Sequence, residues 1–217
     1  VSQFQDYTLL KPTFNREPLA IGQTISLSQG RDKRDLITEV RNPNTQWIAS
    51  VTYSYADGSA EPRVYTQQIL PTARTLLADL GAPGAGSRPT LRVSDIRWER
   101  IDNHQIPNPP NYMAPRLNFL LEDLDIRRYD ASLETPASVT FTIVNDTAYG
   151  YWDGDFYVAL YSGGSIVAVR PLLIDRFEAG SRETIQFNFG SDRLNVSEVV
   201  LLPDIDVFDS ASYLPVE

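Results

Sequence analysis

The sequence predicts an all-β protein made of two consecutive β-sandwich domains, and three observations support this prediction. Apolar and polar side chains alternate at a period of two, in runs rich in Val, Ile, Tyr, Phe and Thr, as half-buried strands require. Small turn-forming residues separate these runs at the spacing of successive strands in a sandwich. The pattern of the first half then returns in the second half.

The clearest strands each place three alternating side chains on one face. These sets are Leu36, Thr38 and Val40, then Val51, Tyr53 and Tyr55, and in the second half Val139, Phe141 and Ile143. The turns predicted between strands are Asp57-Gly58, Gly163-Gly164, Ala179-Gly180 and Gly190-Ser191. Both kinds of signal are typical of an all-β protein.

Residues 72–81 (TARTLLADLG) are the best helix candidate, because Leu76, Leu77 and Leu80 fit a helical spacing. The same leucines fit a strand that leads into the glycine-rich segment GAPGAGSRP. We favour the strand by analogy with SRETIQFNFG, which follows the equivalent strands of the second half.

The repeat preserves the inward and outward phase of three successive strands. An offset of 103 residues places Asn42 on Asn145, and an offset of 105 places Trp47 on Trp152 and Tyr53 on Val158. A slip of one residue would turn every core side chain to solvent, so a preserved phase indicates a duplicated fold. An offset of 107 extends the match by pairing Trp98 with Ile205.

The segment IPNPPNYMAP, residues 106–115, has four prolines and no regular apolar pattern, as expected for a stiff connector between domains. We therefore place one domain at residues 1–105 and the other at 116–217.

Composition excludes several classes of function. The net charge is -9 and no basic run exceeds the pair at 127–128, so the chain lacks the basic surface that nucleic acid requires. The absence of cysteine removes disulfides, thiol catalysis and thiolate metal sites. Apolar stretches such as SIVAVRPLLI are shorter than the roughly 18 residues of a membrane helix.

Each half resembles an immunoglobulin-like domain of bacteria. The resemblance rests on Asn145 followed by FYVALYSGG, residues 156–164, and on Asn42 followed by VTYSYADG. This pattern is similar to the FxLYD and CARDB-like modules of exported bacterial proteins, and the tandem resembles surface proteins that carry an N-terminal membrane anchor. The resemblance implies immunoglobulin-like β-sandwiches, an extracytoplasmic cell-surface location and an adhesive or scaffolding role without catalytic residues. Because the chain begins with Val, we expect that a signal peptide or anchor was removed.

Candidate catalytic groups are sparse, and we predict no enzyme activity. The single histidine, His104, stands beside the connector, and no nucleophile elbow or second zinc-binding histidine accompanies it. Two carboxylates facing each other across a sugar would be needed for glycoside hydrolysis. The candidates for such a pair are Glu122, Asp123, Asp125, Asp153 and Asp155.

Alternate acids form a candidate calcium site at Asp204, Asp206 and Asp209, because Ca²⁺ binds six to eight oxygens. The sequence lacks the Gly and distal Glu of a calcium loop, so solvated acids at strand ends are the favoured interpretation and no cofactor is assigned. Calcium is the one ion kept as an alternative.

Aromatic residues form a candidate ligand-binding surface at Tyr149, Tyr151 and Trp152. The alternative is core packing, and the equivalent positions of Trp47 and Trp152 favour it. Relative to the first half, the turn before Trp152 is longer and carries two extra aromatic rings, which the core pattern does not require.

Taken together, these features predict a non-enzymatic surface or scaffolding module that binds a protein partner or a cell-surface component. Such a module requires an exposed strand edge or an aromatic patch. The alternatives are a carbohydrate-binding or calcium-dependent adhesion module and, last, a hydrolase.

Overall fold

The computed structural model describes residues 15–29, 33–56, 62–83, 89–128, 130, 132, 137–189 and 195–215. The chain divides into two compact units, Val1–Tyr112 and Met113–Glu217. The division lies inside the predicted connector, where a short helix, α2 (Pro109–Met113), replaces the irregular segment expected from the prolines. The helix is capped by Asn108, whose side-chain oxygen accepts a hydrogen bond from the Asn111 N–H at 3.1 Å.

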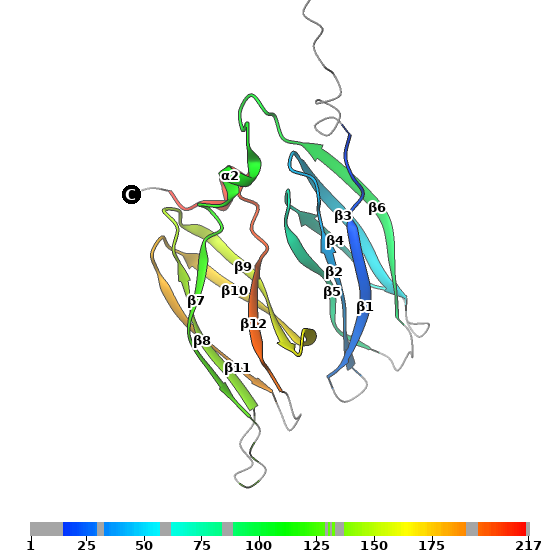
Figure 1. Ribbon diagram of the computed structural model, residues 1–217, viewed down its shortest axis with the longest axis vertical. Helices are drawn as coiled ribbons and strands as arrows, with labels where there is room; N and C mark the ends of the chain where they lie inside the picture. The colour runs from blue at the N-terminus through cyan, green and yellow to red at the C-terminus, as the bar shows by residue number, and fades with distance from the viewer. Residues whose placement is uncertain are drawn as a thin grey trace, which may run out of the picture. The chain divides into compact units, whose positions relative to one another are not determined.

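The first unit consists of two three-stranded antiparallel sheets (Figure 1). One sheet has the order β1 (Ala20–Ser28), β2 (Lys33–Arg41), β5 (Arg74–Pro83). The other has the order β4 (Val64–Ile69), β3 (Trp47–Ala56), β6 (Thr90–Arg100). Strand β5 confirms the strand predicted near residues 72–81.

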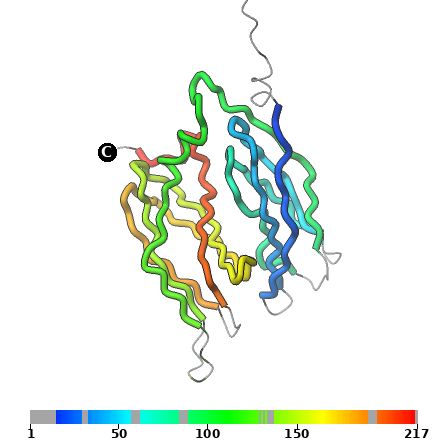
Figure 2. The backbone as a smooth tube through the Cα atoms, viewed as in Figure 1, coloured from blue at the N-terminus to red at the C-terminus, as the bar shows by residue number. Residues whose placement is uncertain are grey.

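The second unit repeats this arrangement. One sheet has the order β7 (Phe119–Arg127), β8 (Ala137–Asn145), β11 (Arg182–Phe189), and the other β10 (Ser165–Phe177), β9 (Tyr151–Ser162), β12 (Glu198–Pro203). A short 3₁₀ helix, η2 (Ser210–Ser212), follows β12. The long hairpin of β9 and β10 turns at Gly163 and Gly164, which both have positive φ and so confirm the predicted glycine turn (Figure 2).

The register of the strands also agrees between the units. In each unit, an asparagine stands at the end of the central strand, and its backbone N–H donates to the carbonyl oxygen of the residue before the edge strand. These bonds join Asn42 to Ala73 and Asn145 to Ser181, both at 3.0 Å. Val51 pairs with Ile96, and its counterpart Phe156 pairs with Pro203. Pro203 lies 107 residues after Ile96, so the strand pairing reproduces the 107-residue offset that the sequence predicts between β6 and β12. The all-β prediction is therefore confirmed, with the same strand order in both units.

Side chains from both sheets form the core of each unit. In the first, Leu36, Val40 and Leu77 from one sheet pack with Val51, Tyr53 and Tyr55 from the other. In the second, the ring of Phe119 lies 5.0 Å from that of Phe156 and 5.8 Å from that of Phe177. These contacts join the two layers of each unit, as in a sandwich.

The asparagines that end the central strands also link the two layers. Asn145 is fully buried, and its side-chain amide donates to the carbonyl oxygens of Tyr149, Phe177 and Glu178. Asn42 is likewise buried and donates to Trp47 and Ile69. Each amide thus ties the end of one sheet to strands of the other.

The predicted turns at Asp57-Gly58 and Gly190-Ser191 lie outside the described residues. In the part of the chain that is described, no helix has the length and apolar character needed to cross a membrane.

Candidate functional site

The second unit has a small open cavity, which we call the Trp152 hollow. It lies between the start of β9, the segment after β12 and η2, and has a volume of about 330 Å³. Its lining residues are Trp152, Asp153, Asp155, Asp204, Ile205, Asp206, Asp209, Ala211 and Ser212. The hollow thus brings together the two acidic stretches that are separated in the sequence.

Strand pairing explains how the acids meet. The N–H of Asp204 donates to the carbonyl oxygen of Asp155 at 2.8 Å, which continues the β9–β12 ladder by one step beyond β12. This bond holds the backbone of Asp204 directly beside that of Asp155. Two neighbouring carboxylates therefore sit at one edge of the hollow.

Burial raises the pKa of the Asp155 carboxyl from 3.8 to about 6, and repulsion from Asp204 and Asp153 adds to the rise, while a hydrogen bond from the Phe156 N–H opposes it. The second unit as a whole is also negatively charged. Residues 113–217 contain 17 acidic residues against 7 arginines and no lysine, so the second unit holds all of the excess negative charge of the chain. A cation in the hollow would relieve this repulsion.

We expect Asp155→Asn to stabilise the protein by about 1 kcal/mol at pH 7.5. A rise of about two pKa units corresponds to about 3 kcal/mol, and partial solvent exposure reduces this several-fold. Below pH 3.8 Asp155 is protonated in both the folded and the unfolded protein and carries no destabilising charge. As pH rises through 6, the folded protein must ionise this buried carboxyl, and the stability is lost. The gain should therefore largely disappear at pH 4.

Urea unfolding at pH 7.5 and pH 4 measures this difference. Asp146→Asn, at an exposed position outside the hollow, serves as the matched control. An equal gain at both pH values would contradict the electrostatic explanation.

The structure separates the three predicted aromatic ligand residues. Trp152 is 44% exposed at the hollow, which corrects the expectation that it packs in the core. Tyr151 is fully buried, with its ring 5.8 Å from that of Phe119, so it cannot belong to an exposed patch. Tyr149 is half-buried, and the guanidinium of Arg116 lies 4.4 Å from its ring.

The longer turn before β9 explains why Tyr151 is buried and Trp152 is exposed. The segment between Asn145 and Trp152 is longer than the one between Asn42 and Trp47, and in the longer turn Tyr151 enters the core. Its hydroxyl donates to the Arg116 carbonyl, and its backbone pairs with Tyr213. Trp152 then lies on the surface.

Two of the three predicted calcium ligands have local structural roles. Asp206 accepts a hydrogen bond from the Phe208 N–H at 2.9 Å, and Asp209 caps η2 by accepting from the Ala211 N–H at 2.8 Å. Within the described residues, no three His, Cys, Asp or Glu side chains are arranged to hold a metal ion. The hollow offers Asp204 beside Asp155 instead.

The remaining candidate acids of the first sheet of the second unit take part in ion pairs. Glu122 and Asp123 both approach Arg182, at 2.6 Å and 3.8 Å, and Asp125 pairs with Arg127. His104 is exposed in a turn, where its N–H donates to the Asp102 side chain.

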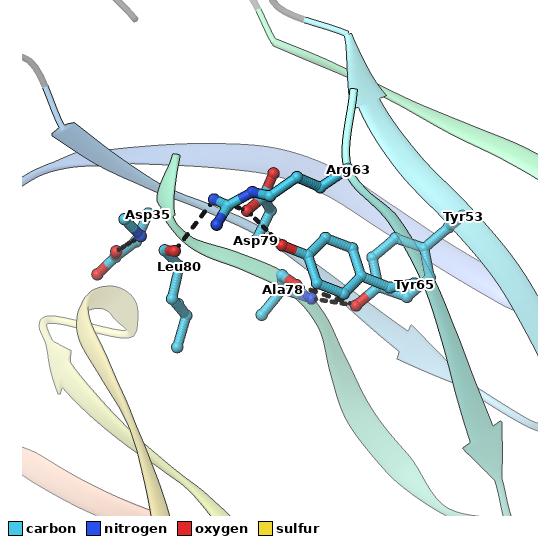
Figure 3. A network of polar contacts seen from close by, with 8 residues as sticks. Asp35, Tyr53, Arg63, Tyr65, Ala78, Asp79 and Leu80 are labelled. Carbon is cyan, nitrogen blue, oxygen red and sulfur yellow. Dashed lines mark hydrogen bonds and ion pairs between the residues drawn. The ribbon is translucent and has the colours of Figure 1, made fainter. Parts of the chain in front are cut away.

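The first unit contains a second polar cluster, which the sequence analysis did not predict (Figure 3). The buried carboxylate of Asp79 forms an ion pair with Arg63 and accepts a hydrogen bond from the Tyr65 hydroxyl. Burial, followed by the hydrogen bond to Asp79 and the charge of Asp79, raises the pKa of Tyr65 to about 12. The Tyr65 hydroxyl therefore stays protonated as a donor.

This cluster closes part of the open edge of β5. The Tyr53 hydroxyl accepts from the Ala78 N–H at 2.9 Å and donates to the Ala78 carbonyl at 3.0 Å, while Arg63 donates to the Leu80 carbonyl (Figure 3). Asp35 accepts from the Gly81 N–H at 2.8 Å. We therefore assign these side chains a structural role.

Comparison with protein-family models and with curated proteins finds no match for this chain.

Proposed function

We propose that the chain is a non-enzymatic binding module that recognises a protein partner outside the cytoplasm. The shared strand order of the two units supports an interpretation as tandem immunoglobulin-like domains. The resemblance of residues 156–164 to exported bacterial modules supports the location. Such domains bind through surface patches and strand edges rather than through deep catalytic clefts.

The observation that carries the proposal is the exposed indole of Trp152 beside Asp153, Asp155 and Asp204 in one hollow. An indole face attracts a cation, and neighbouring carboxylates add a charge interaction. Burial raises the pKa of Asp155, and the carboxylates of Asp204 and Asp153 raise it further, so a cation in the hollow would meet several negative charges. A Lys or Arg side chain of the partner matches both features.

Calorimetric titration with a tetra-arginine peptide tests this proposal. We expect binding that weakens about fivefold in Trp152→Ala, equivalent to about 1 kcal/mol for a cation–π contact. Binding should also weaken in Asp155→Asn, with added salt, and as pH falls through 6, because Asp155 then loses its charge.

Val64→Ala is the matched control, since Val64 is another exposed apolar residue but lies in the first unit. Binding by Trp152→Ala at wild-type strength would exclude the hollow as the site. Repeating the titration in EDTA and in millimolar Ca²⁺ separates the peptide from calcium as the occupant, because calcium would compete with the peptide.

Carbohydrate binding is the second candidate, favoured by the 44% exposure of Trp152 alone. Exposed aromatic rings provide a flat apolar surface on which a sugar ring can stack. A neutral oligosaccharide would bind with little dependence on salt or on Asp155. The same variants, titrated with cello- and chito-oligosaccharides, therefore distinguish the two ligands.

A further inference from the structure

Strand β11 presents an open edge in the second unit. Among the described residues it lies at the end of its sheet and pairs only with β8, over eight residues in unbroken register. It contains neither Pro nor Gly. Such a strand leaves a row of backbone donors and acceptors available to another extended chain.

In an antiparallel ladder the backbone groups of every second residue face the partner strand, and this alternation shows which groups of β11 are unpaired. The Asn145 N–H donates to Ser181, so in this antiparallel ladder Glu183, Ile185 and Phe187 face β8 with their backbone groups. The N–H and C=O groups of the intervening Thr184, Gln186 and Asn188 point away from β8. Among the described residues, no side chain or strand bonds to these backbone groups.

The equivalent strand of the first unit, β5, is closed at its middle, around Ala78. Ala78 occupies the position that matches Gln186, and the Tyr53 hydroxyl satisfies both of its backbone groups. The repeat places Val158 at the position of Tyr53, and valine has no hydroxyl to offer. The second unit therefore lacks the side chain that closes the middle of this edge in the first unit.

Other edge strands in the described part of the chain are interrupted or short. Register shifts break the pairing of β1, β6, β7 and β10. Strands β4 and β12 have six residues each. Bulges and short strands are common devices that prevent edge pairing, and β11 has neither.

The side chains of β11 favour an added strand. Ile185 and Phe187 face the core, where Phe187 lies 6.2 Å from Phe141, yet both are only half-buried. A neighbouring strand with apolar residues at alternate positions would cover them. Thr184, Gln186 and Asn188 on the other face are exposed.

We propose that β11 binds an extended, basic segment of a partner protein, which adds to the sheet β7–β8–β11 as a fourth strand. This inference rests on the proposed protein-binding function but uses a different surface from the Trp152 hollow. The charge of the second unit, with 17 acidic residues against 7 arginines, favours a segment carrying Lys or Arg. The same charge opposes pairing with a second copy of this chain.

The probe is a peptide of about ten residues in which Lys alternates with Val and Ile, a length matching one strand. Amide hydrogen exchange by NMR reports on individual residues. In the free protein, the N–H groups of Thr184, Gln186 and Asn188 should exchange faster than those of Glu183, Ile185 and Phe187. At about 1 mM peptide, exchange of the first three should slow at least tenfold.

Gln186→Pro removes one open N–H without breaking the ladder to β8, because proline is tolerated on the free side of an edge strand. This variant should lose the protection, whereas Gln186→Thr, which keeps the N–H, should retain it. A peptide N-methylated at alternate residues should also fail to protect wild-type protein, and this control does not depend on how any variant folds. Replacing Lys by Glu should weaken binding at least tenfold.

Several results would overturn the proposal. These are unchanged exchange at 1 mM peptide, protection by the N-methylated peptide, or equal binding by Gln186→Pro in its folded form. Trp152→Ala should leave the protection of β11 intact. If the wild-type protein fails to bind tetra-arginine while the peptide protects β11, the proposal for the hollow alone is contradicted. If it binds tetra-arginine while β11 stays unprotected, this inference alone is contradicted.

Discussion

Asn145→Ala should lower the free energy of unfolding of the second unit by about 3 kcal/mol. The substitution leaves the carbonyls of Tyr149, Phe177 and Glu178 without this donor, and each lost bond in a buried place costs about 1 kcal/mol. The side-chain oxygen of Asn145 also accepts from the Thr147 N–H and hydroxyl. The alanine therefore removes the link between two sheets as well as a turn contact.

Urea unfolding monitored by hydrogen exchange, read separately for peptides of each unit, measures this loss. Asn118→Ala is the control, because Asn118 also bonds to backbone and side-chain oxygens but is exposed. We expect it to change stability by less than about 0.5 kcal/mol. Equal effects of the two variants would show that the buried asparagine does not hold the sheets together.

Tyr53→Phe should destabilise the first unit by about 2 kcal/mol. The ring stays, but the N–H and C=O of Ala78 both lose their partner in a buried environment. The ring contact with Tyr65, at 5.5 Å between centroids, is preserved, so the change isolates the hydroxyl. The variant also opens the edge of β5.

Denaturation of Tyr53→Phe should be compared with that of Thr52→Ala, which removes an exposed hydrogen bond to Thr66 from the adjacent residue of the same strand. The alanine should cost less than about 0.5 kcal/mol. The Ala78 amide should also exchange faster in Tyr53→Phe. Unchanged exchange at Ala78 would contradict the closing role of the hydroxyl.

Much of the fold could be predicted because the repeat preserves strand phase. The side chains expected on one face, such as Val51, Tyr53 and Phe141, are buried in the structure. Phase is a local property, since it depends only on alternation within a strand. The strand over residues 74–83 could be predicted for a different reason, namely that its counterpart in the second half was easier to recognise.

The site could be predicted only in part. Trp47 and Trp152 are equivalent in the repeat, yet the longer turn of the second unit places Tyr151 in the core and leaves Trp152 exposed. Alignment preserves positions but cannot show which of two adjacent rings turns inward. Similarly, the approach of Asp155 to Asp204 depends on pairing between distant strands.

The buried amide of Asn145 also bears on chemical ageing. Deamidation begins when the backbone nitrogen of the next residue, Asp146, attacks the side-chain carbon of the asparagine, which requires the side chain to rotate. Three donated hydrogen bonds oppose this rotation, and the product would place a carboxylate against three carbonyl oxygens. The lifetime of this residue as an asparagine is therefore set by how often the second unit unfolds.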